Sequence, residues 1–327
     1  DWYCGIYERY QHPVLEAEHV PLHWRFDLDQ RHNPFLAERL GIGVVFNPGA
    51  LLHEGKILLC ARVEGADRKS FLAFAESTSG IDGFRFWPEP MNVPELPGEA
   101  DVNVYDIRLT RHEDGWVYGV FCTEIEDPER PGSGWARAGL VRSRDLVRWE
   151  RLPNLVVPSR QQRNAVLHPE FVDGKYAFYT RPQETFLAQG EGTTGLAFGL
   201  VDDITRPRIG QETIIDSPYF HSIKDAKNGQ GPAPIKTPEG WLHLAHAVRG
   251  CAAGMRYTIY AFMTRLDAPA VPLYQPGGHL IAPLFDERVG DVSNVVFVNG
   301  WVERDGVVYV YYASSDTRVH VATTSVE

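Results

Sequence analysis

The sequence has 327 residues, of which 43% are apolar and 12% aromatic, and its formal net charge is −11. This composition suffices for a large hydrophobic core, and the length alone allows one to three domains. The acidic balance, without any basic run, argues against nucleic acid or anionic membranes as partners. No apolar stretch approaches the roughly 20 residues that a membrane-spanning helix needs.

Residues 1–40 form a leader that is rich in aromatic side chains and interrupted by prolines. Asn33 followed by Pro34 is typical of a helix start and Gly41 of a helix end, so a short helix is predicted over residues 35–40. We expect this N-terminal extension to pack against the main body, residues 41–327, or against a neighbouring subunit. No signal peptide is visible, and whether a segment was trimmed before Asp1 stays open.

From residue 41 onwards a repeat follows, in which a glycine opens a run of alternating apolar residues. The starting glycines are 60, 59, 66 and 66 residues apart. Each follows a polar, turn-like residue or pair, which is the strongest short-range signal of a β-hairpin. The five runs begin at Gly55, Gly115, Gly174, Gly240 and Gly306.

Further strand patterns flank these runs, and helical periodicity is almost absent after Leu40. Five units of at least three antiparallel strands predict an all-β fold, a five-bladed β-propeller catalytic domain over residues 41–327. A β-sandwich is the alternative, but a sandwich does not require five evenly spaced units.

The repeat also predicts where a ligand binds, because the first strands of propeller blades converge at the mouth of a central channel. Polar residues occupy matching offsets around the repeat glycines, where a purely structural barrel would carry Val, Ile or Ala. Such a ring suits a polar ligand in a central pocket. These residues are Asn47, Arg62, Asp106, Glu124, Arg163, Arg181, His246, Asn294 and Asp316.

The stretch over residues 100–110 carries the strongest candidate. Asp106 and Arg108 are two apart on a predicted strand and therefore point to the same face. An aspartate and an arginine at this spacing, taken alone, commonly form a structural ion pair. Its place within the repeat favours a functional role for Asp106.

Several other sequence features indicate structural roles and not metal binding or catalysis. The twelve histidines do not cluster at metal-ligand spacing, and His243 and His246 face opposite sides of one strand. The four cysteines fit neither a zinc ribbon nor a redox pair, so we expect reduced thiols and a cytoplasmic protein. The Gly-rich run over residues 190–195 opens a strand and indicates a mobile loop. The run over residues 143–149 indicates an outer-blade turn with a packed Trp149.

Several motifs occur together in a family-specific order. They include Asn-Pro-Gly at 47–49, Arg-Val-Glu-Gly-Ala-Asp-Arg-Lys-Ser at 62–70, Asn-Val-Tyr-Asp-Ile-Arg at 103–108, Gln-Gln-Arg-Asn at 161–164, Leu-His-Pro-Glu at 167–170, Tyr-Thr-Arg-Pro at 179–182, Lys-Asn-Gly at 227–229, Trp-Leu-His-Leu-Ala-His at 241–246 and Ser-Ser-Asp-Thr-Arg at 314–318. From about Asn33 to the C-terminus the sequence resembles glycoside hydrolase family 130, most closely its members that act on mannosyl-glucose.

This resemblance implies a five-bladed propeller and a hexosyltransferase-type β-mannoside phosphorylase. The implied reaction is the reversible, inverting phosphorolysis of 4-O-β-D-mannosyl-D-glucose to α-D-mannose 1-phosphate and D-glucose. Inorganic phosphate is then the co-substrate, and neither a cofactor nor a metal is expected. A homo-oligomer is left open.

The resemblance also assigns residues, all in the numbering of this sequence. It implies that Asp106 is the catalytic acid. The implied phosphate-binding residues are Arg163, Arg181, Lys227, His246 and Tyr257, with Lys224 left open as an alternative to Lys227. The implied sugar-binding residues are Asn47, Arg62, Arg68, Asn103, Tyr105 and Asp316.

The residue types suit that chemistry, because a phosphate dianion needs cationic forks and point charges that overcome the overall negative charge. Three alternatives stay open: a phosphorylase acting on mannobiose or mannosyl-N-acetylglucosamine, a β-mannoside hydrolase on the same fold, and a non-catalytic sugar-binding propeller. An inverting hydrolase needs a second carboxylate as base, and the place where it would sit is predicted to be basic.

Overall fold

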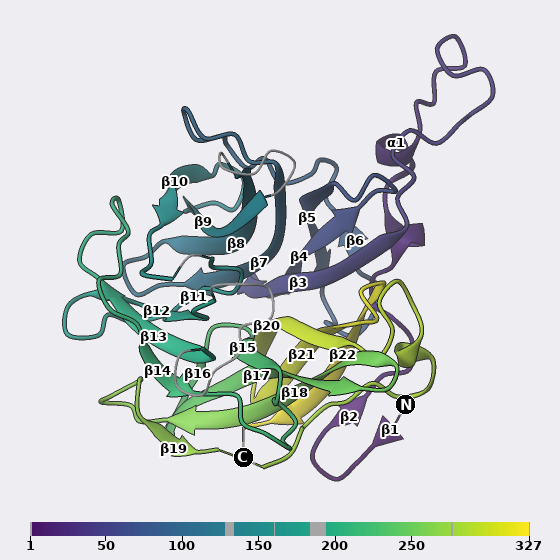
Figure 1. Ribbon diagram of the computed structural model, residues 1–327. Coiled ribbons are helices and arrows are strands. Elements are labelled where there is room, and N and C mark those ends of the chain that lie inside the picture. Colours follow the sequence, from purple (N-terminus) through teal and green to yellow (C-terminus); the bar gives the residue numbers. More distant parts are fainter. Residues whose placement is uncertain (1, 128–133, 160, 184–193, 276, 327) are drawn as a thin grey trace.

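The computed structural model describes residues 2–127, 134–159, 161–183, 194–275 and 277–326. It contains five antiparallel sheets arranged around a common centre (Figure 1). The first strands of the sheets, β3, β7, β11, β15 and β20, line that centre, so each sheet is one blade. The five-bladed propeller is therefore confirmed, and the sandwich is excluded.

The blades follow one another along the chain. Blade one contains β3 (Val44–His53), β4 (Lys56–Glu64), β5 (Ser70–Ser77) and β6 (Arg85–Phe86). Blade two contains β7 (Asn103–Arg111), β8 (Val117–Glu126), β9 (Gly134–Ser143) and β10 (Glu150–Leu155). Blade three contains β11 (Val166–Leu167), β12 (Tyr176–Thr180), β13 (Leu196–Val201) and β14 (Thr213–Asp216).

Blade four contains β15 (Lys227–Gln230), β16 (Ile235–Thr237), β17 (Gly240–Cys251), β18 (Gly254–Thr264) and β19 (Pro272–Tyr274), with β15 and β16 both paired to β17. Blade five contains β20 (Val296–Arg304), β21 (Val307–Ser314) and β22 (Arg318–Ser325), and a short 3-10 helix, Phe285–Arg288, precedes it.

The repeat glycines lie within two residues of the start of β4, β8, β12, β17 and β21, as the sequence predicts. At Gly55 the backbone φ angle is +77° and at Gly306 it is +82°, and the residues before them, Glu54 and Asp305, also have positive φ angles of 50° and 55°. Two consecutive left-handed residues match the right-handed twist of the strands that the turn joins. These local turns set the register of the hairpins.

Apolar faces of neighbouring blades pack against each other and form the core. Between blades one and two, Leu58, Phe74, Ile107 and Phe121 are almost fully buried in one cluster. Burying a side chain of this size contributes about 1.5–3 kcal/mol. Trp149 stacks on Phe74 with ring centroids 6.1 Å apart, so the predicted packing role of Trp149 is confirmed.

The leader completes blade five. Strands β1 (Trp2–Tyr3) and β2 (Glu8–Arg9) extend the sheet through pairing of β2 with β22, beside the yellow C-terminal strands in Figure 1. After a 3-10 turn, Ala17–His19, helix α1 (Leu22–Arg25) places Trp24 against blade one. The chain division at residue 40 and packing on a neighbouring subunit stay predictions.

The predicted helix over residues 35–40 is wrong. The Asn33 amide bonds both the N–H and the carbonyl of Ala37, each at 2.9 Å, which closes a loop instead of starting a helix. Leu36 has a φ angle of 49°, and Phe35 is 92% exposed. A six-residue helix without a buried face is too short to be stable. The segment therefore forms a projecting arm beyond α1, seen at the upper right of Figure 1.

Cys60 and Cys122 are buried, Cys4 and Cys251 are exposed, and all four are free thiols. Burial raises the pKa of both buried thiols, so they behave as small apolar side chains. The predicted loop over residues 190–195 lies largely outside the described residues. Within the described part of the chain, no helix is long and apolar enough to cross a membrane.

Candidate active site at the centre of the propeller

A pocket of about 190 Å³ lies at the centre, where all five blades meet. It brings together nine of the predicted site residues. These are Asn47, Arg62, Tyr105, Asp106, Arg163, Arg181, Lys227, Tyr257 and Asp316.

Asp106 lies at an irregularity of the innermost strand. The pairing of β7 with β8 shifts register between Tyr105 and Arg108, and Asp106 has a left-handed φ angle of 56°. Asn47 repeats this pattern in blade one, with a φ of 45° at a register shift of β3. Such bulges re-aim side chains, and here they bring the Asn47 amide within 3.0 Å of Asp106 Oδ1.

Arg62 is the second group on the same carboxylate oxygen, with Nη1 3.3 Å from Asp106 Oδ1. Its guanidinium lies between the rings of Phe46 and Tyr105, 4.5 Å from each centroid. Its other nitrogens bond Ser70 Oγ at 2.9 Å and ion-pair with Glu64. Arg62 is therefore fixed on all sides and holds one oxygen of Asp106 in place.

Arg108 does not ion-pair with the Asp106 carboxylate. It is fully buried and donates instead to the backbone carbonyls of Asp106, at 3.0 Å, and Gly231, at 3.4 Å. The left-handed turn at Asp106 breaks the strand alternation that would place both side chains together. Burial lowers the pKa of Arg108 to about 10. Arg108 therefore stabilises the backbone of the bulge through these two hydrogen bonds.

Three cations lie on the side of the pocket formed by blades three and four. Arg163 Nη1 donates to Tyr105 Oη at 2.7 Å and lies 3.3 Å from Glu124 Oε1. The Arg181 guanidinium is almost completely buried, and burial lowers its pKa. Burial, together with Arg181 and Arg163, lowers the pKa of Lys227 to about 7. Packing cations together is costly unless an anion joins them.

His246 lies beneath Arg181 and does not line the pocket. Its Nε2 is 2.9 Å from Arg181 Nη1, and its ring packs on Phe297 with centroids 4.6 Å apart. Burial and the neighbouring cations hold the pKa of His246 well below its usual range, so Nε2 of the neutral ring accepts from Arg181. A direct contact of His246 with phosphate stays a prediction.

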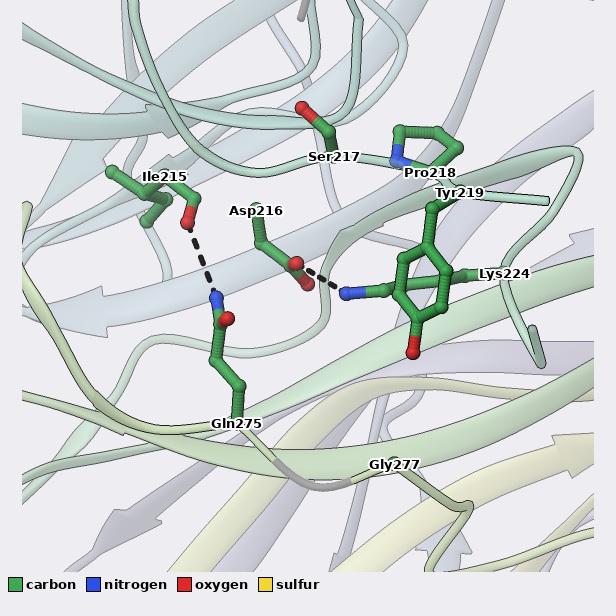
Figure 2. A pocket seen from close by; sticks show the side chains of 8 residues that line it. All are labelled: Ile215, Asp216, Ser217, Pro218, Tyr219, Lys224, Gln275 and Gly277. Atoms are coloured by element: carbon green, nitrogen blue, oxygen red, sulfur yellow. Dashed lines mark hydrogen bonds and ion pairs between the residues drawn. The ribbon is translucent and has the colours of Figure 1, made fainter. Parts of the chain in front are cut away.

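The structure distinguishes the two candidate lysines. Lys227 lines the central pocket, whereas Lys224 forms a buried ion pair with Asp216 in a separate pocket between blades three and four (Figure 2). Tyr260 also donates to Asp216, at 2.6 Å. Because Lys224 is already neutralised there, only Lys227 of these two contributes its charge to the centre.

Asp316 and Arg68 lie on the side of blades one and five, and Asn103 lies at the start of β7 in blade two. Asp316 is partly buried, and its pKa rises to about 7 because it is desolvated next to Asp106. Asp316 and Arg62 also line an adjoining hollow of about 530 Å³, where Arg68 lies. Asn103 lies outside both linings. Its side chain bonds the backbone of Ser70 and Arg68 and so ties their loop to β7.

Sequence reasoning missed five lining residues. They are Arg108, Asn164, Val292, Val295 and Phe297. Asn164 could have been found, since it follows Arg163 within one motif. The apolar side chains of blade five carry no chemical signal in the sequence, because Val and Phe are ordinary in strands and beside them. No group of side chains that could hold a metal ion occurs among the described residues.

The fold and the site define a β-propeller with a polar central pocket, in which one anchored carboxylate faces a cluster of cations. Residues 18–327 match the family model of glycoside hydrolase family 130, described as β-1,4-mannooligosaccharide phosphorylase. The chain belongs to this family.

Similar proteins include the 4-O-β-D-mannosyl-D-glucose phosphorylase of Bacteroides fragilis, which is 57% identical over 99% of this chain and 83% of its own length. The β-1,4-mannooligosaccharide phosphorylase of Ruminococcus albus is 31% identical over 59% of this chain and 57% of its own length. The structure of β-1,2-mannobiose phosphorylase from Listeria innocua superposes with a TM-score of 0.77 at 19% identity, covering 98% of this chain and 97% of that one.

Proposed function

We propose that this protein catalyses the reversible phosphorolysis of 4-O-β-D-mannosyl-D-glucose to α-D-mannose 1-phosphate and D-glucose. The single observation that carries the proposal is the division of the central pocket. The carboxylate of Asp106 is anchored on one side, and the cations Arg163, Arg181 and Lys227 lie on the other. The identity to the mannosyl-glucose phosphorylase of Bacteroides fragilis supports this choice of disaccharide.

In the proposed reaction, a phosphate oxygen held by the cations attacks the anomeric carbon of the mannosyl unit. The bond between that carbon and glucose O4 breaks, and the proton from Asp106 passes to O4, directly or through the mannosyl 3-hydroxyl. Attack opposite the leaving group inverts the β-mannoside to the α-phosphate. Arginine forks and a lysine point charge suit a phosphate group, and Tyr257 and His246 complete the proposed phosphate-binding set.

Water must lose a proton before it attacks, so inverting hydrolases carry a second carboxylate as base. Phosphate is already anionic and needs none. The pocket does contain a second carboxylate, Asp316, but it lies beside Arg62 and Asp106 and not among the cations. We therefore place Asp316, with Asn47, Arg62 and Tyr105, on the mannosyl unit. Arg68 in the adjoining hollow is proposed for the glucose side, and Asn103 acts on that side by supporting the loop of Arg68.

Incubation with mannosyl-glucose, with and without phosphate, tests the proposal when followed by proton and phosphorus NMR. We expect α-mannose 1-phosphate and glucose only when phosphate is present. Free mannose formed at a comparable rate without phosphate would establish the hydrolase alternative. Parallel reactions with mannobiose and mannosyl-N-acetylglucosamine measure the preference for the acceptor sugar. If kcat/KM is higher for either of them than for mannosyl-glucose, that disaccharide is the proposed substrate instead.

A further inference from the structure

A second polar hollow, of about 360 Å³, lies at blade four, between the loop that follows β14 and the hairpin of β17 and β18. Arg249, Arg256, Thr258 and His279 line it, together with Asp225. None of these residues lines the central pocket. The family-specific motifs do not include them either.

Strand β18 separates this hollow from the central pocket. Neighbouring residues on a strand point to opposite faces. Tyr257 lines the central pocket, whereas Arg256 and Thr258, on either side of it, line the hollow. The two cavities therefore lie back to back across one hairpin, and a ligand in the hollow would not compete for the same side chains.

The two arginines of the hollow face each other directly, because Arg249 pairs with Arg256 in the register of β17 and β18. Like charges directly opposite on neighbouring strands are destabilising. Across the described part of the chain, neither guanidinium has a hydrogen bond, an ion pair or a ring contact. Lys224 in the neighbouring pocket of Figure 2 differs, since Asp216 neutralises it.

Two further polar groups lie beside these arginines. Thr258 is only 4% exposed, and its hydroxyl oxygen has no hydrogen-bond partner among the described residues. Burial and the two arginines lower the pKa of His279, which shows that its imidazole lies within their field. The only carboxylate on the lining, that of Asp225, accepts from the backbone N–H of Gly250 at 3.3 Å and forms no ion pair with either arginine.

We propose that this hollow is a second anion site, which binds a phosphoryl group through the Arg249 and Arg256 guanidinium groups and the Thr258 hydroxyl. Two arginine forks match the geometry of phosphate oxygens, and their mutual repulsion falls when a dianion lies between them. The phosphoryl group can come from inorganic phosphate or from a sugar phosphate. The inference goes beyond the proposed catalytic function and does not depend on it.

Equilibrium dialysis with radiolabelled inorganic phosphate, and in a second arm with α-mannose 1-phosphate, tests this assignment. We expect two bound anions per wild-type chain and one per chain of the double variant R249Q/R256Q, with binding at the hollow at least about tenfold weaker. Arg181→Ala should weaken the central site and leave the second one intact. Whichever of the two ligands, inorganic phosphate or α-mannose 1-phosphate, binds more tightly at the hollow is the source of the phosphoryl group.

The matched control is R148Q/R206Q, which removes two exposed arginines that are paired with Asp145 and Asp203 on the surface. This control changes the net charge by the same amount as R249Q/R256Q, and we expect it still to bind two anions per chain. Phosphorolysis at low phosphate should be unchanged in R249Q/R256Q. A single bound anion per wild-type chain in both arms, or two in R249Q/R256Q as in the control, would overturn the proposal even if phosphorolysis is observed.

Discussion

At the scale of single residues, the site depends on how Asp106 is held. We predict that Asp106→Asn abolishes phosphorolysis, because the amide cannot supply the proton that the leaving oxygen needs. General acid catalysis contributes roughly 10²–10⁴-fold, and glucose is a poor leaving group, so the loss should lie near the upper end. Initial rates with saturating phosphate measure it, and circular dichroism checks folding. A folded variant that keeps more than about a tenth of the activity would contradict a role as acid.

Arg181→Ala and Arg163→Ala should mainly damage the use of phosphate. Each removes a charge-assisted contact worth about 1.5–3 kcal/mol, so the apparent KM for phosphate should rise tenfold or more. Titrating phosphate at saturating disaccharide gives this KM. The matched control is Arg111→Ala, which alters an exposed arginine at the C-terminal end of β7. If the KM for phosphate is unchanged in a variant, the altered arginine does not bind phosphate.

Lys227 should make phosphate binding depend on pH near neutrality. Its pKa of about 7 means that the ammonium is fully charged below that pH and loses its proton as the pH rises through it. Phosphate favours the charged form. The KM for phosphate should therefore rise above pH 7. In Lys227→Arg the guanidinium stays charged, so this rise should disappear. Because phosphate itself also ionises near neutrality, the test is the comparison, and an identical pH dependence of KM in wild type and Lys227→Arg would exclude a contribution from Lys227.

At the scale of elements, the innermost strand of blade four packs so closely that only glycine fits. A Cβ atom at Gly229 would collide with Asn164 Oδ1 and would lie 2.8 Å from His246 Cε1 and 3.1 Å from Arg181 Cδ. Gly229→Ala should therefore displace Arg181 and raise the KM for phosphate more than it lowers kcat. Gly250→Ala, where no atom lies within 4 Å, is the control in the same blade. Equal phosphate KM values for both variants would show that the contact is tolerated.

The elements also show what the sequence could predict. The hairpins were predictable because each depends on a local turn that begins a run of alternating residues. The bulge at Asp106 was not, since the register shift needs the partner strand β8. The helix over residues 35–40 failed because the capping pattern was present without a face to bury. The choice between Lys224 and Lys227 needed Asp216, whose position depends on the packing of blade three against blade four.

At the scale of the whole molecule, the leader and the last blade share a buried ionic cluster. Arg9 on β2 ion-pairs with Glu287 and donates to Tyr312 Oη at 2.8 Å and to the carbonyl of Ala282 at 2.9 Å. Arg9→Met should destabilise the fold by about 3–5 kcal/mol, because it leaves Glu287 buried without its cation. The double variant with Glu287→Gln should recover part of this loss. Denaturant unfolding measures both, and equal stability of Arg9→Met and wild type would contradict the coupling.

The pairing of β2 with β22 also has a consequence for the order of events during synthesis. Glu8 pairs with Thr323, so the ribosome must add about 300 residues before the partner strand exists. At about 5–20 residues per second, β2 leaves the exit tunnel roughly 15–60 s before β22 is made. Through that interval Arg9 and the open edge of β2 stay in water or with a chaperone. Strand β2 is therefore made early but placed late, and the sheet of blade five is complete only after β22 has left the ribosome.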